Sequence, residues 1–334
     1  MISVIIATHN RRRLLAETLP AIAGQDLPAE GLEVLVVDNA SDDGTAEMVA
    51  AFALREGIPE VRLLHEARPG KSYAVNRAVA LARGRILVCT DDDVLPDRGW
   101  VRAVIDAMDE TGADFAVGRI RPRWQVPPPA WMSPALYGVL AVPDNGAERF
   151  EIRAGLNEQA MPIGANMAVR ADVVRRLGGW REDLGKLQQT LRSGEDHEFF
   201  LRMLRAGMRG VYEPRASVAH FVPAERLRRG YFTRWLYDNG ATTWAIEQEY
   251  PTTPHYLLRV PRHLWRELAV ESGRFLRVLF AGGPPDRFAS FTRLLWFAGY
   301  LRAAWTGGPR AARPAAEPGV AAATGAGGAA SRGH

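Results

Sequence analysis

Three consecutive aspartates, Asp91, Asp92 and Asp93, follow directly on the run RILVCT. In an open α/β sheet, ligands bind beyond the carboxyl ends of the strands, which is where this cluster would lie. Hard carboxylate oxygens suit Mg²⁺ or Mn²⁺, and such an ion keeps positions free for substrate phosphates and water. The cluster therefore predicts a divalent metal and a diphosphate-bearing substrate. A solvated turn, or an N-cap for the helix after Pro96, is the structural alternative.

A second acidic turn, in VVDNASDDGT, also follows an apolar run. Asp38 stands at the predicted strand end, where an acidic residue binds ribose or a base in other nucleotide-binding folds. We interpret Ser41, Asp42 and Asp43 mainly as caps of the helix that begins near Gly44. Only Asp38 of this turn is therefore a candidate binding residue.

Further polar groups follow the first apolar run, in ATHNRRR. Thr8, Asn10 and Arg12 offer a hydroxyl, an amide and a guanidinium group to a base or a phosphate. Lys71 opens a later helix, whose free backbone N–H groups and cation favour phosphate contact. The segment RPGKS is not a complete phosphate loop, because His65 stands where that motif requires its first glycine. No G-x-G-x-x-G follows the first strand, which argues against a nicotinamide dehydrogenase.

An acidic pair, Glu195 and Asp196, begins the predicted helix EDHEFFLRMLRAG. A carboxylate at a helix N-terminus is stabilised as the anion, which is the state that accepts a proton. Either residue is therefore a candidate general base, with an ordinary helix-end carboxylate as the alternative. His220, in ASVAHF, is a candidate metal ligand or a packed core histidine.

Short β-branched runs alternate with helical or turn segments from Ser3 to Ile120, which predicts a mostly parallel sheet covered by helices. The proline-rich segment 121–159 is predicted to run over the surface, as loops that cover ligands often do. Regular pattern returns with IGANMAVR, ADVVRRLG and EDHEFFLRMLRAG. The first domain is therefore predicted to span residues 1–223.

Residues 224–305, rich in aromatic residues and arginine, are predicted to form a second, helical unit on the acceptor side or at a membrane surface. Its helical pieces include GYFTRWLYDNGATTWAIEQEY and SFTRLLWFAGYLRAAW, and none has the roughly 20 apolar residues that span a bilayer. The second piece is either an amphipathic helix in a membrane interface or part of a subdomain that packs its aromatic residues internally. Residues 306–334 are rich in alanine, glycine and proline and are predicted to be disordered.

A composition of 47% hydrophobic and 24% charged residues is typical of a folded protein. The net charge of +4 is small for 334 residues, so acidic lipid or nucleotide phosphates explain it and nucleic acid is not implied. The one cysteine, Cys89, cannot form an intrachain disulfide, which fits a reducing compartment. The first residues lack the features of a secretory signal, so we expect a cytoplasmic protein, with or without peripheral contact with the membrane.

The chain closely resembles the family 2 glycosyltransferases of the GT-A fold in an ordered series of segments: SVIIATHNR, VVDNASDDGT, RPGKSYAVNRAVALARGRILVCTDDDV, GANMAVR and SGEDHEFFLRMLRAG. The resemblance implies that Asp91 to Asp93 supply the Asp-X-Asp function, that Asp196 is the base and that His220 is a further metal ligand. The residues that it places around the nucleotide are Thr8, Asn10, Asp38, Lys71 and Asn76. One departure is Arg68 and Pro69, where the family usually has an asparagine before its glycine.

The implied reaction is an inverting transfer from a nucleoside-diphosphate sugar to a hydroxyl of a glycan, a lipid-linked acceptor or a small molecule. Asp196 would take the proton of that hydroxyl, and a metal would stabilise the departing diphosphate. One alternative is a sugar-nucleotide-forming nucleotidyltransferase, which is disfavoured because residues 8–13 contain no glycine for a triphosphate loop. Another is a noncatalytic nucleotide- or glycan-binding protein, in which the acidic clusters would lack a purpose.

Overall fold

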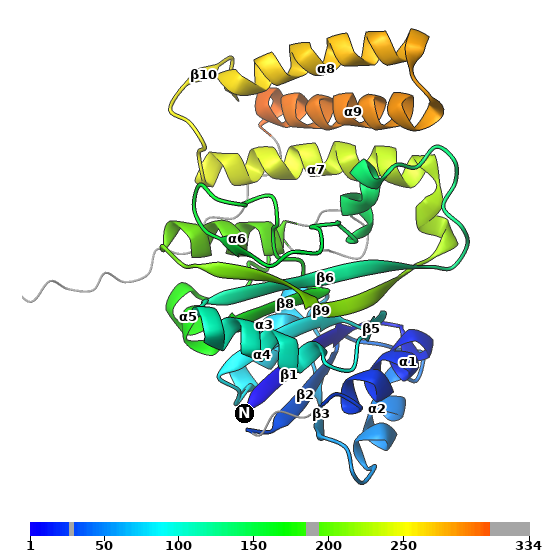
Figure 1. Cartoon of the computed structure of the whole chain (residues 1–334), viewed down its shortest axis with the longest axis vertical. Helices are drawn as coiled ribbons and strands as arrows, with labels where there is room; N and C mark the ends of the chain where they lie inside the picture. Colours follow the sequence, from blue (N-terminus) through cyan, green and yellow to red (C-terminus); the bar gives the residue numbers. More distant parts are fainter. Residues whose placement is uncertain (27–29, 185–193, 308–334) are drawn as a thin grey trace, which may run out of the picture.

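The structure is a computed structural model, and it describes residues 1–26, 30–184 and 194–307. A twisted sheet with helices on both faces forms one part of the molecule, and a stack of long helices forms the other (Figure 1). The tail predicted to be disordered lies, from residue 308 onward, outside the described residues.

In the described part of the chain, nine strands form the main sheet, in the order β3-β2-β1-β4-β8-β6-β9-β5, with β7 beside β9. The strands β1 to β4 run parallel to one another, whereas β8 is antiparallel to both β4 and β6. The bounds are β1 (Ile2–Thr8), β2 (Leu32–Asp38), β3 (Glu60–His65), β4 (Ile86–Asp91), β5 (Val94–Pro96), β6 (Phe115–Trp124), β7 (Phe150–Ile152), β8 (Asn166–Arg170) and β9 (Gly210–Val222).

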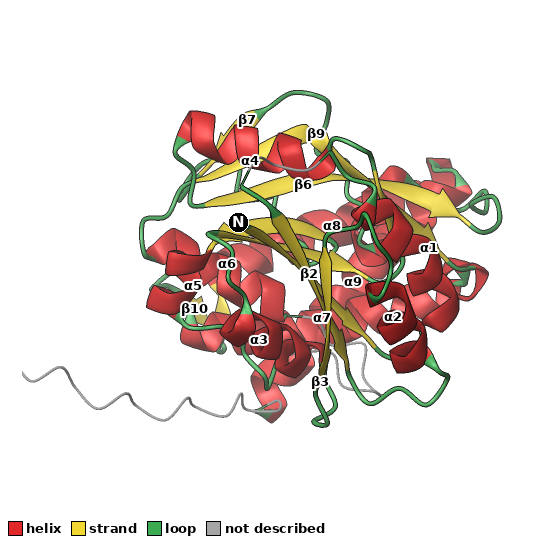
Figure 2. Cartoon of the chain, turned by 90° about the horizontal axis from the view of Figure 1, so that it is seen from below, coloured by secondary structure: helices red, strands yellow, loops and turns green. Residues whose placement is uncertain are grey.

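Helices cover both faces of this sheet (Figure 2). One face carries α1 (Arg12–Ala23), α2 (Thr45–Ala53) and α4 (Trp100–Thr111), and the other carries α3 (Lys71–Leu81), α5 (Ala171–Leu177) and α6 (Glu195–Arg205). Along β1, Val4 and Ile6 pack with the first group and Ile5 packs with the second. This alternation is that of a strand buried on both faces, so the predicted α/β fold is confirmed.

The segment 121–159 does not run over the surface throughout, so that prediction was wrong in part. The strand β6 continues to Trp124, and a 3₁₀ helix, η1 (Pro134–Leu140), buries Leu136 and Leu140. Trp131 packs edge-to-face on Phe288, with ring centroids 4.6 Å apart. The apolar side chains of this segment are buried because helices far along the chain cover them, which local pattern does not reveal.

After η2 (Ala224–Leu227), the chain forms α7 (Arg229–Glu249), a small hairpin of β10 (Tyr256–Leu257) and β11 (Val260–Pro261), α8 (Arg262–Ala281) and α9 (Pro284–Thr306). The helix α9 lies between α7 and α8 (Figure 1). Glycines allow α7 and α9 to pack closely: a Cβ on Gly240 would lie 2.1 Å from the Trp296 carbonyl oxygen, and one on Gly299 would lie 2.0 Å from that of Tyr237.

The aromatic residues of α9 are mostly packed internally: Trp296, Phe297 and Tyr300 are buried, whereas Phe291 and Trp305 are exposed. Of the two structures considered for this piece, the packed subdomain is the one observed. Among the helices that the structure describes, none combines the length and the hydropathy that crossing a bilayer requires.

Candidate active site

The parallel strands β1, β2 and β4 end at one edge of the sheet, where the register pairs Thr8 with Asp38 and Ala7 with Asp91. Beyond this edge lies a cavity of about 670 Å³. The predicted site residues that line it are Thr8, Lys71, Asp91, Asp92, Asp93, Glu195, Asp196 and His220. Segments distant in sequence therefore meet at the position expected for a ligand in an open α/β sheet.

Two predicted residues of the first loop are not among the lining residues. The Asn10 side chain accepts a hydrogen bond from the backbone N–H of Asp42 (2.8 Å), and the Arg12 backbone N–H donates to Asp43 (3.0 Å). These contacts tie the loop after β1 to the loop after β2. The nucleotide contacts predicted for Asn10 and Arg12 stay predictions.

Asp38 and Asn76 also stand outside the lining. Asp38 is buried and accepts a hydrogen bond from the backbone N–H of Ser41 (3.3 Å). The Asn76 amide donates to the Trp180 carbonyl oxygen (2.7 Å) and accepts from the Trp180 backbone N–H (2.8 Å). In this structure Asn76 therefore holds a turn, and its predicted role at the nucleotide remains untested.

Each of the three consecutive aspartates has a different partner. Lys71 Nζ lies 2.5 Å from Asp91 Oδ1, and the Thr8 hydroxyl donates to Asp92 Oδ2 (2.7 Å). Burial, followed by the neighbouring charge of Asp93, raises the pKa of the Asp92 carboxyl. Asp92 is therefore held by Thr8 of the first strand, whereas the carboxylates of Asp91 and Asp93 contact other groups.

Asp93 and His220 meet because β5 and β9 are antiparallel neighbours, with Val94 opposite His220. His220 Nε2 lies 3.1 Å from Asp93 Oδ1, and both side chains are almost fully buried. Burial alone would raise the pKa of Asp93, but the contact with His220 outweighs it and lowers that pKa to about 2. Asp93 therefore stays ionised in a buried position.

The same pair fits a divalent cation. Within the described residues, Asp93 Oδ1 and His220 Nδ1 are buried without a well-formed hydrogen bond. Ligand atoms of Asp91, Asp93 and His220 all lie within 4.8 Å of one another. Two carboxylates and an imidazole form a donor set that Mn²⁺ or Mg²⁺ accepts, and a cation would satisfy the orphaned oxygen.

The second acidic group begins α6. Asp196 accepts hydrogen bonds from the indole N–H of Trp180 (3.0 Å) and from the backbone N–H of Gly164 (2.9 Å). Burial raises the pKa of Asp196, although the Lys71 ammonium opposes this effect. Glu195 is 5% exposed, and burial together with the charge of Asp196 raises its pKa to about 7.

Lys71 connects the two acidic groups. Burial would lower the pKa of Lys71, but the charges of Asp91, Asp196 and Glu195 outweigh it and raise that pKa. A Cβ on Gly164 would lie 2.8 Å from Lys71 Nζ and 3.2 Å from Asp196 Oδ2. The glycine of GANMA therefore leaves room beside the backbone for the ends of both the Lys71 and the Asp196 side chains.

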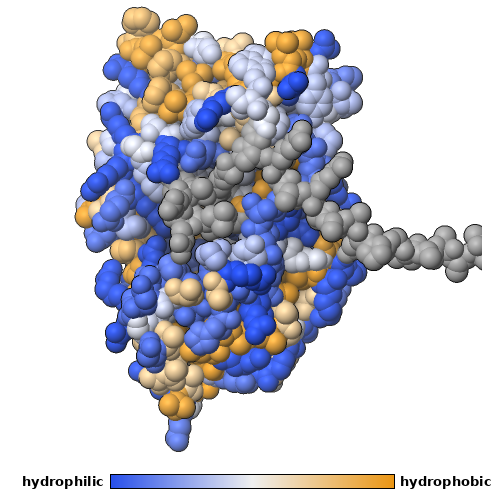
Figure 3. Space-filling view, turned by 180° about the vertical axis from the view of Figure 1, so that it is seen from behind, coloured by the Kyte–Doolittle hydropathy of each residue, from blue (hydrophilic) through white to orange (hydrophobic). Residues whose placement is uncertain are grey.

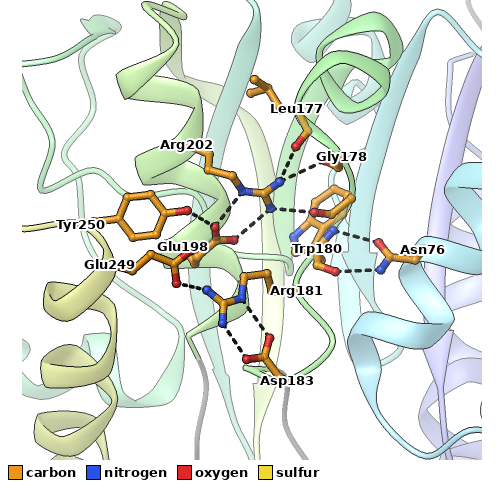
Figure 4. A network of polar contacts seen from close by, with 11 residues as sticks. Asn76, Leu177, Gly178, Trp180, Arg181, Asp183, Glu198, Arg202, Glu249 and Tyr250 are labelled. Carbon is orange, nitrogen blue, oxygen red and sulfur yellow. Dashed lines mark hydrogen bonds and ion pairs between the residues drawn. The ribbon is translucent and has the colours of Figure 1, made fainter. Parts of the chain in front are cut away.

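A polar network holds the turn that carries Trp180 (Figure 4). From α3, Asn76 binds the Trp180 backbone, and from α6, Arg202 donates to the carbonyl oxygen of Gly179 (2.6 Å). Arg202 also contacts Glu198, whose other partner is the Tyr250 hydroxyl just after α7 (2.6 Å). The hydrogen bond from Trp180 to Asp196 is thus fixed by three separate elements.

Several lining residues escaped the sequence analysis. Arg11 Nη1 lies 4.0 Å from Asp93, and both Arg11 and Arg226 help to lower the pKa of that carboxyl. The run of arginines at 11–13 was visible, but the start of α1 decides which of them faces the cavity. Tyr231, Trp235 and Asn239 line one side from α7 at a four-residue spacing, which is a helical signal without an indication of what it faces. Further lining residues are His9, Asn39, Leu140, Met161 and His197.

Comparison with known families decides the class of this site. Residues 3–178, more than half of the chain, match the family Glycosyl transferase family 2. The chain belongs to this family. It is therefore a glycosyltransferase, as the order of its motifs predicted.

Curated relatives of this family 2 glycosyltransferase agree with the assignment. Glycosyltransferase AglE of Haloferax volcanii is 25% identical over 83% of this chain and 90% of its own length. The pre-mycofactocin glycosyltransferase of Mycobacterium tuberculosis is 24% identical over 81% of this chain. The chain spans only 53% of the length of that second relative.

Solved structures of low identity share the fold. A mannosyltransferase from Pyrobaculum calidifontis, in complex with GDP-Man and Mn²⁺, superposes with a TM-score of 0.57 at 21% identity, over 91% of this chain and 86% of its own. S. aureus TarS 1-349 in complex with UDP superposes with a TM-score of 0.54 at 16% identity, over 92% and 91% of the two chains. The GT-A fold predicted for this glycosyltransferase is confirmed.

Proposed function

We propose that this glycosyltransferase moves a sugar, with inversion, from a nucleoside-diphosphate sugar to an acceptor hydroxyl. The observation that carries the proposal is the joint position of two acidic groups on one cavity, with the Lys71 ammonium beside both. One group suits a metal and a diphosphate, and the other suits a general base. The product would be a polysaccharide, a glycolipid or another glycoconjugate.

On the donor side, Asp91, Asp93 and His220 would hold Mn²⁺ or Mg²⁺. When bound, the ion supplies Lewis-acid stabilisation of the negative charge on the departing nucleoside diphosphate. Arg11 and Arg226 line the same cavity and add fixed positive charge for the phosphates. The mannosyltransferase solved with GDP-Man and Mn²⁺ supports a donor of this chemical class.

On the base side, Asp196 takes the proton of the acceptor hydroxyl as its oxygen attacks the anomeric carbon and the bond to the diphosphate breaks. Trp180 and Gly164 each donate one hydrogen bond to the carboxylate, so both oxygens keep a free lone pair. A pKa raised by burial makes Asp196 a stronger base than an exposed aspartate. Glu195, which lines the same cavity, is the second candidate.

The acceptor enters, in this proposal, along the wall formed by Tyr231 and Trp235 of α7 and by Leu140 of η1. Aromatic and apolar side chains bind the apolar faces of ligands, and a few polar groups set their orientation. Residues 1–223, together with Arg226, would then bind the donor, while α7, within residues 224–305, would form the acceptor side. The acceptor is a hydroxyl of a glycan, of a lipid-linked molecule or of a small molecule.

A panel of nucleotide sugars, assayed for release of nucleoside diphosphate with and without Mn²⁺, tests the proposal. We expect release from a preferred donor, loss of release with a chelator and recovery when Mn²⁺ is added. Release of pyrophosphate from a nucleoside triphosphate and a sugar phosphate would indicate the nucleotidyltransferase alternative. Absence of both reactions would favour a noncatalytic binding protein.

A further inference from the structure

The helix α8 forms the outermost layer of the helical stack, and α9 separates it from α7 (Figure 1). Leu264 is the one buried residue that α8 contains. Bulky apolar side chains are exposed along the helix: Val270 (72%), Leu276 (59%), Leu279 (41%) and Phe280 (88%). In the view from behind, hydrophobic side chains gather at this end of the molecule, with hydrophilic ones between them (Figure 3).

The same helix is basic. Residues 259–281 contain five arginines and two glutamates. Both glutamates already have partners, because Glu267 contacts Arg293 (3.1 Å) and Glu271 contacts Arg274 (3.8 Å). In the part of the chain that the structure describes, Arg262, Arg266 and Arg277 are exposed and have no acidic partner. Positive charge is therefore available to an external partner.

A second exposed apolar feature stands at the beginning of α8, at the turn between β10 and β11. Leu258 and Arg259 have positive φ angles of 52° and 66°, in the left-handed region that favours glycine. A two-residue hairpin turn requires this conformation, which is strained for leucine and arginine. The turn leaves Leu257 49% exposed and Leu258 65% exposed. Strained backbone is often retained at functional sites, and here the strained turn displays two apolar side chains to the outside.

We propose that α8 and the β10–β11 turn dock on an anionic membrane surface. An interfacial helix lies with its apolar side chains at the boundary of the acyl chains and its cations among anionic headgroups. Phe280 and Val270 of α8 are the most exposed apolar residues of this surface and, with Leu258 of the turn, would enter that boundary. Docking would leave the cavity accessible, because α7 contributes to the cavity wall whereas α8 lies on the far side of α9.

The charge distribution selects this partner over a second copy of the chain. A symmetric contact through α8 would bring the unpaired Arg262, Arg266 and Arg277 of one copy near those of the other, and like charges repel. An anionic lipid surface instead attracts arginine. Each exposed arginine raises the partition coefficient of the protein onto such a membrane about fivefold at low salt. A neutral surface lacks this contribution, so the proposal requires anionic lipid.

Flotation of the full chain with vesicles of phosphatidylcholine, with and without phosphatidylglycerol, tests the proposal. We expect flotation only with the anionic vesicles, and we expect it to weaken as salt is added. The variants Arg266→Gln with Arg277→Gln, and Leu276→Ser with Phe280→Ser, should each lower the partition coefficient at least about tenfold. Matched controls are Leu54→Ser, which changes an apolar residue that is 85% exposed on another surface, and Arg55→Gln with Arg175→Gln.

Three results would overturn the proposal: no flotation at low salt, equal flotation with neutral vesicles, or equal losses in the controls and the α8 variants. A dimer in sedimentation that Phe280→Ser dissociates, without flotation, would assign the face to a second copy. Donor hydrolysis by the same proteins keeps this test separate from the proposed function. All α8 variants should hydrolyse the donor like the parent chain, whether or not they float.

Discussion

At the residue scale, three adjacent aspartates differ because β4 ends at Asp91 and the chain turns through Asp92 and Asp93, so that each carboxylate meets a different group. Asp92 faces the Thr8 hydroxyl, while Asp91 and Asp93 supply atoms to the cluster with His220. Burial raises the pKa of Asp92, whereas the contact with His220 keeps the pKa of Asp93 low. One sequence motif therefore contains carboxylates with different pKa values and partners. We assign metal binding to Asp91 and Asp93.

Replacing Asp93 tests that assignment. Asp93→Ala, and Asp93→Asn of equal size, should remove most of the nucleotide affinity that depends on Mn²⁺, because a buried ligand next to His220 is lost. Calorimetric titration with nucleoside diphosphate, with and without Mn²⁺, measures it. Asp97→Ala changes an aspartate that pairs with Arg121 outside the cavity lining and should bind like the parent. Unchanged affinity in both Asp93 variants would reject the assignment.

Asp196→Asn distinguishes a base from a helix-end carboxylate. Loss of a general base typically slows a reaction about 10²- to 10⁴-fold, whereas loss of a helix-end charge costs about 0.3–1 kcal/mol of stability. We expect transfer at least about a hundredfold slower, with donor and metal binding nearly unchanged. The control Asp172→Asn removes an exposed first-turn aspartate of α5 and should leave transfer unaffected. Near-normal transfer by Asp196→Asn would point to Glu195 as the base.

The raised pKa of Glu195 predicts that the stability of the protein depends on pH. Burial raises its pKa from 4.5 to about 7, so the folded chain holds this proton more tightly than the unfolded chain. The stabilisation is complete below pH 4.5 and is lost as the pH rises to about 7. Glu195→Gln should therefore increase the free energy of unfolding at pH 8 by on the order of 1–3 kcal/mol, and change it little at pH 4. Urea unfolding at both pH values measures this, and an equal change at both would contradict it.

At the scale of elements, the acidic start of α6 is positioned by backbone groups from other parts of the chain. Gly164 lies just before β8 and Trp180 lies just after α5, and both donate to Asp196. The network of Figure 4 joins that turn to α3, to α6 and to the end of α7. The position of the base therefore depends on how four elements pack.

Gly164→Ala tests this positioning. The added Cβ would lie 2.8 Å from Lys71 Nζ and 3.2 Å from Asp196 Oδ2, so one of these groups must move. A displacement of about 1 Å at reacting groups costs up to about 10²-fold, and we expect kcat to fall roughly tenfold to a hundredfold with the fold intact. Gly99→Ala is the matched control, because a Cβ at Gly99 would have no neighbour within 4 Å. Equal kcat values for the two variants would show that the close approach is unimportant.

At the scale of the whole molecule, the cavity is formed jointly by the sheet edge, by η1 and by α7. Packing around Trp131 joins these parts, since its ring contacts Phe232 of α7 and Phe288 of α9. The helical stack therefore contributes directly to the site. Its outer layer, α8, is available for a different contact.

Trp235→Ala tests whether α7 binds the acceptor. We expect the KM for the acceptor to rise about tenfold or more, because a buried aromatic contact is worth about 1–3 kcal/mol, while hydrolysis of the donor alone continues. Trp305→Ala is the control in the same stack, since Trp305 is 54% exposed and does not line the cavity. A rise in the KM for the donor instead would place Trp235 on the donor side.

The local sequence pattern was sufficient to predict much of the fold and part of the site. The apolar runs that became β1, β2 and β4 each end next to a polar group, and parallel strands align such ends at one edge. For that reason Thr8, the aspartate cluster and the family were predictable from the order of segments alone. The strand period, the start of a helix and the end of a strand are each determined by a few neighbouring residues. They can therefore be predicted without knowing which distant segment packs against them.

Only the tertiary structure decided which side of each element faces the cavity. Arg11 lines the cavity, whereas Arg12, which the sequence analysis predicts as a ligand contact, does not. The exposed amphipathic face belongs to α8, whereas α9, for which the sequence left a membrane-interface role open, lies inside the helical stack. The contacts of Gly164 and Trp180 with Asp196 join residues 32 and 16 positions apart. Helix orientation depends on apolar surface contributed by distant segments, and a short sequence window does not contain the segment that supplies it.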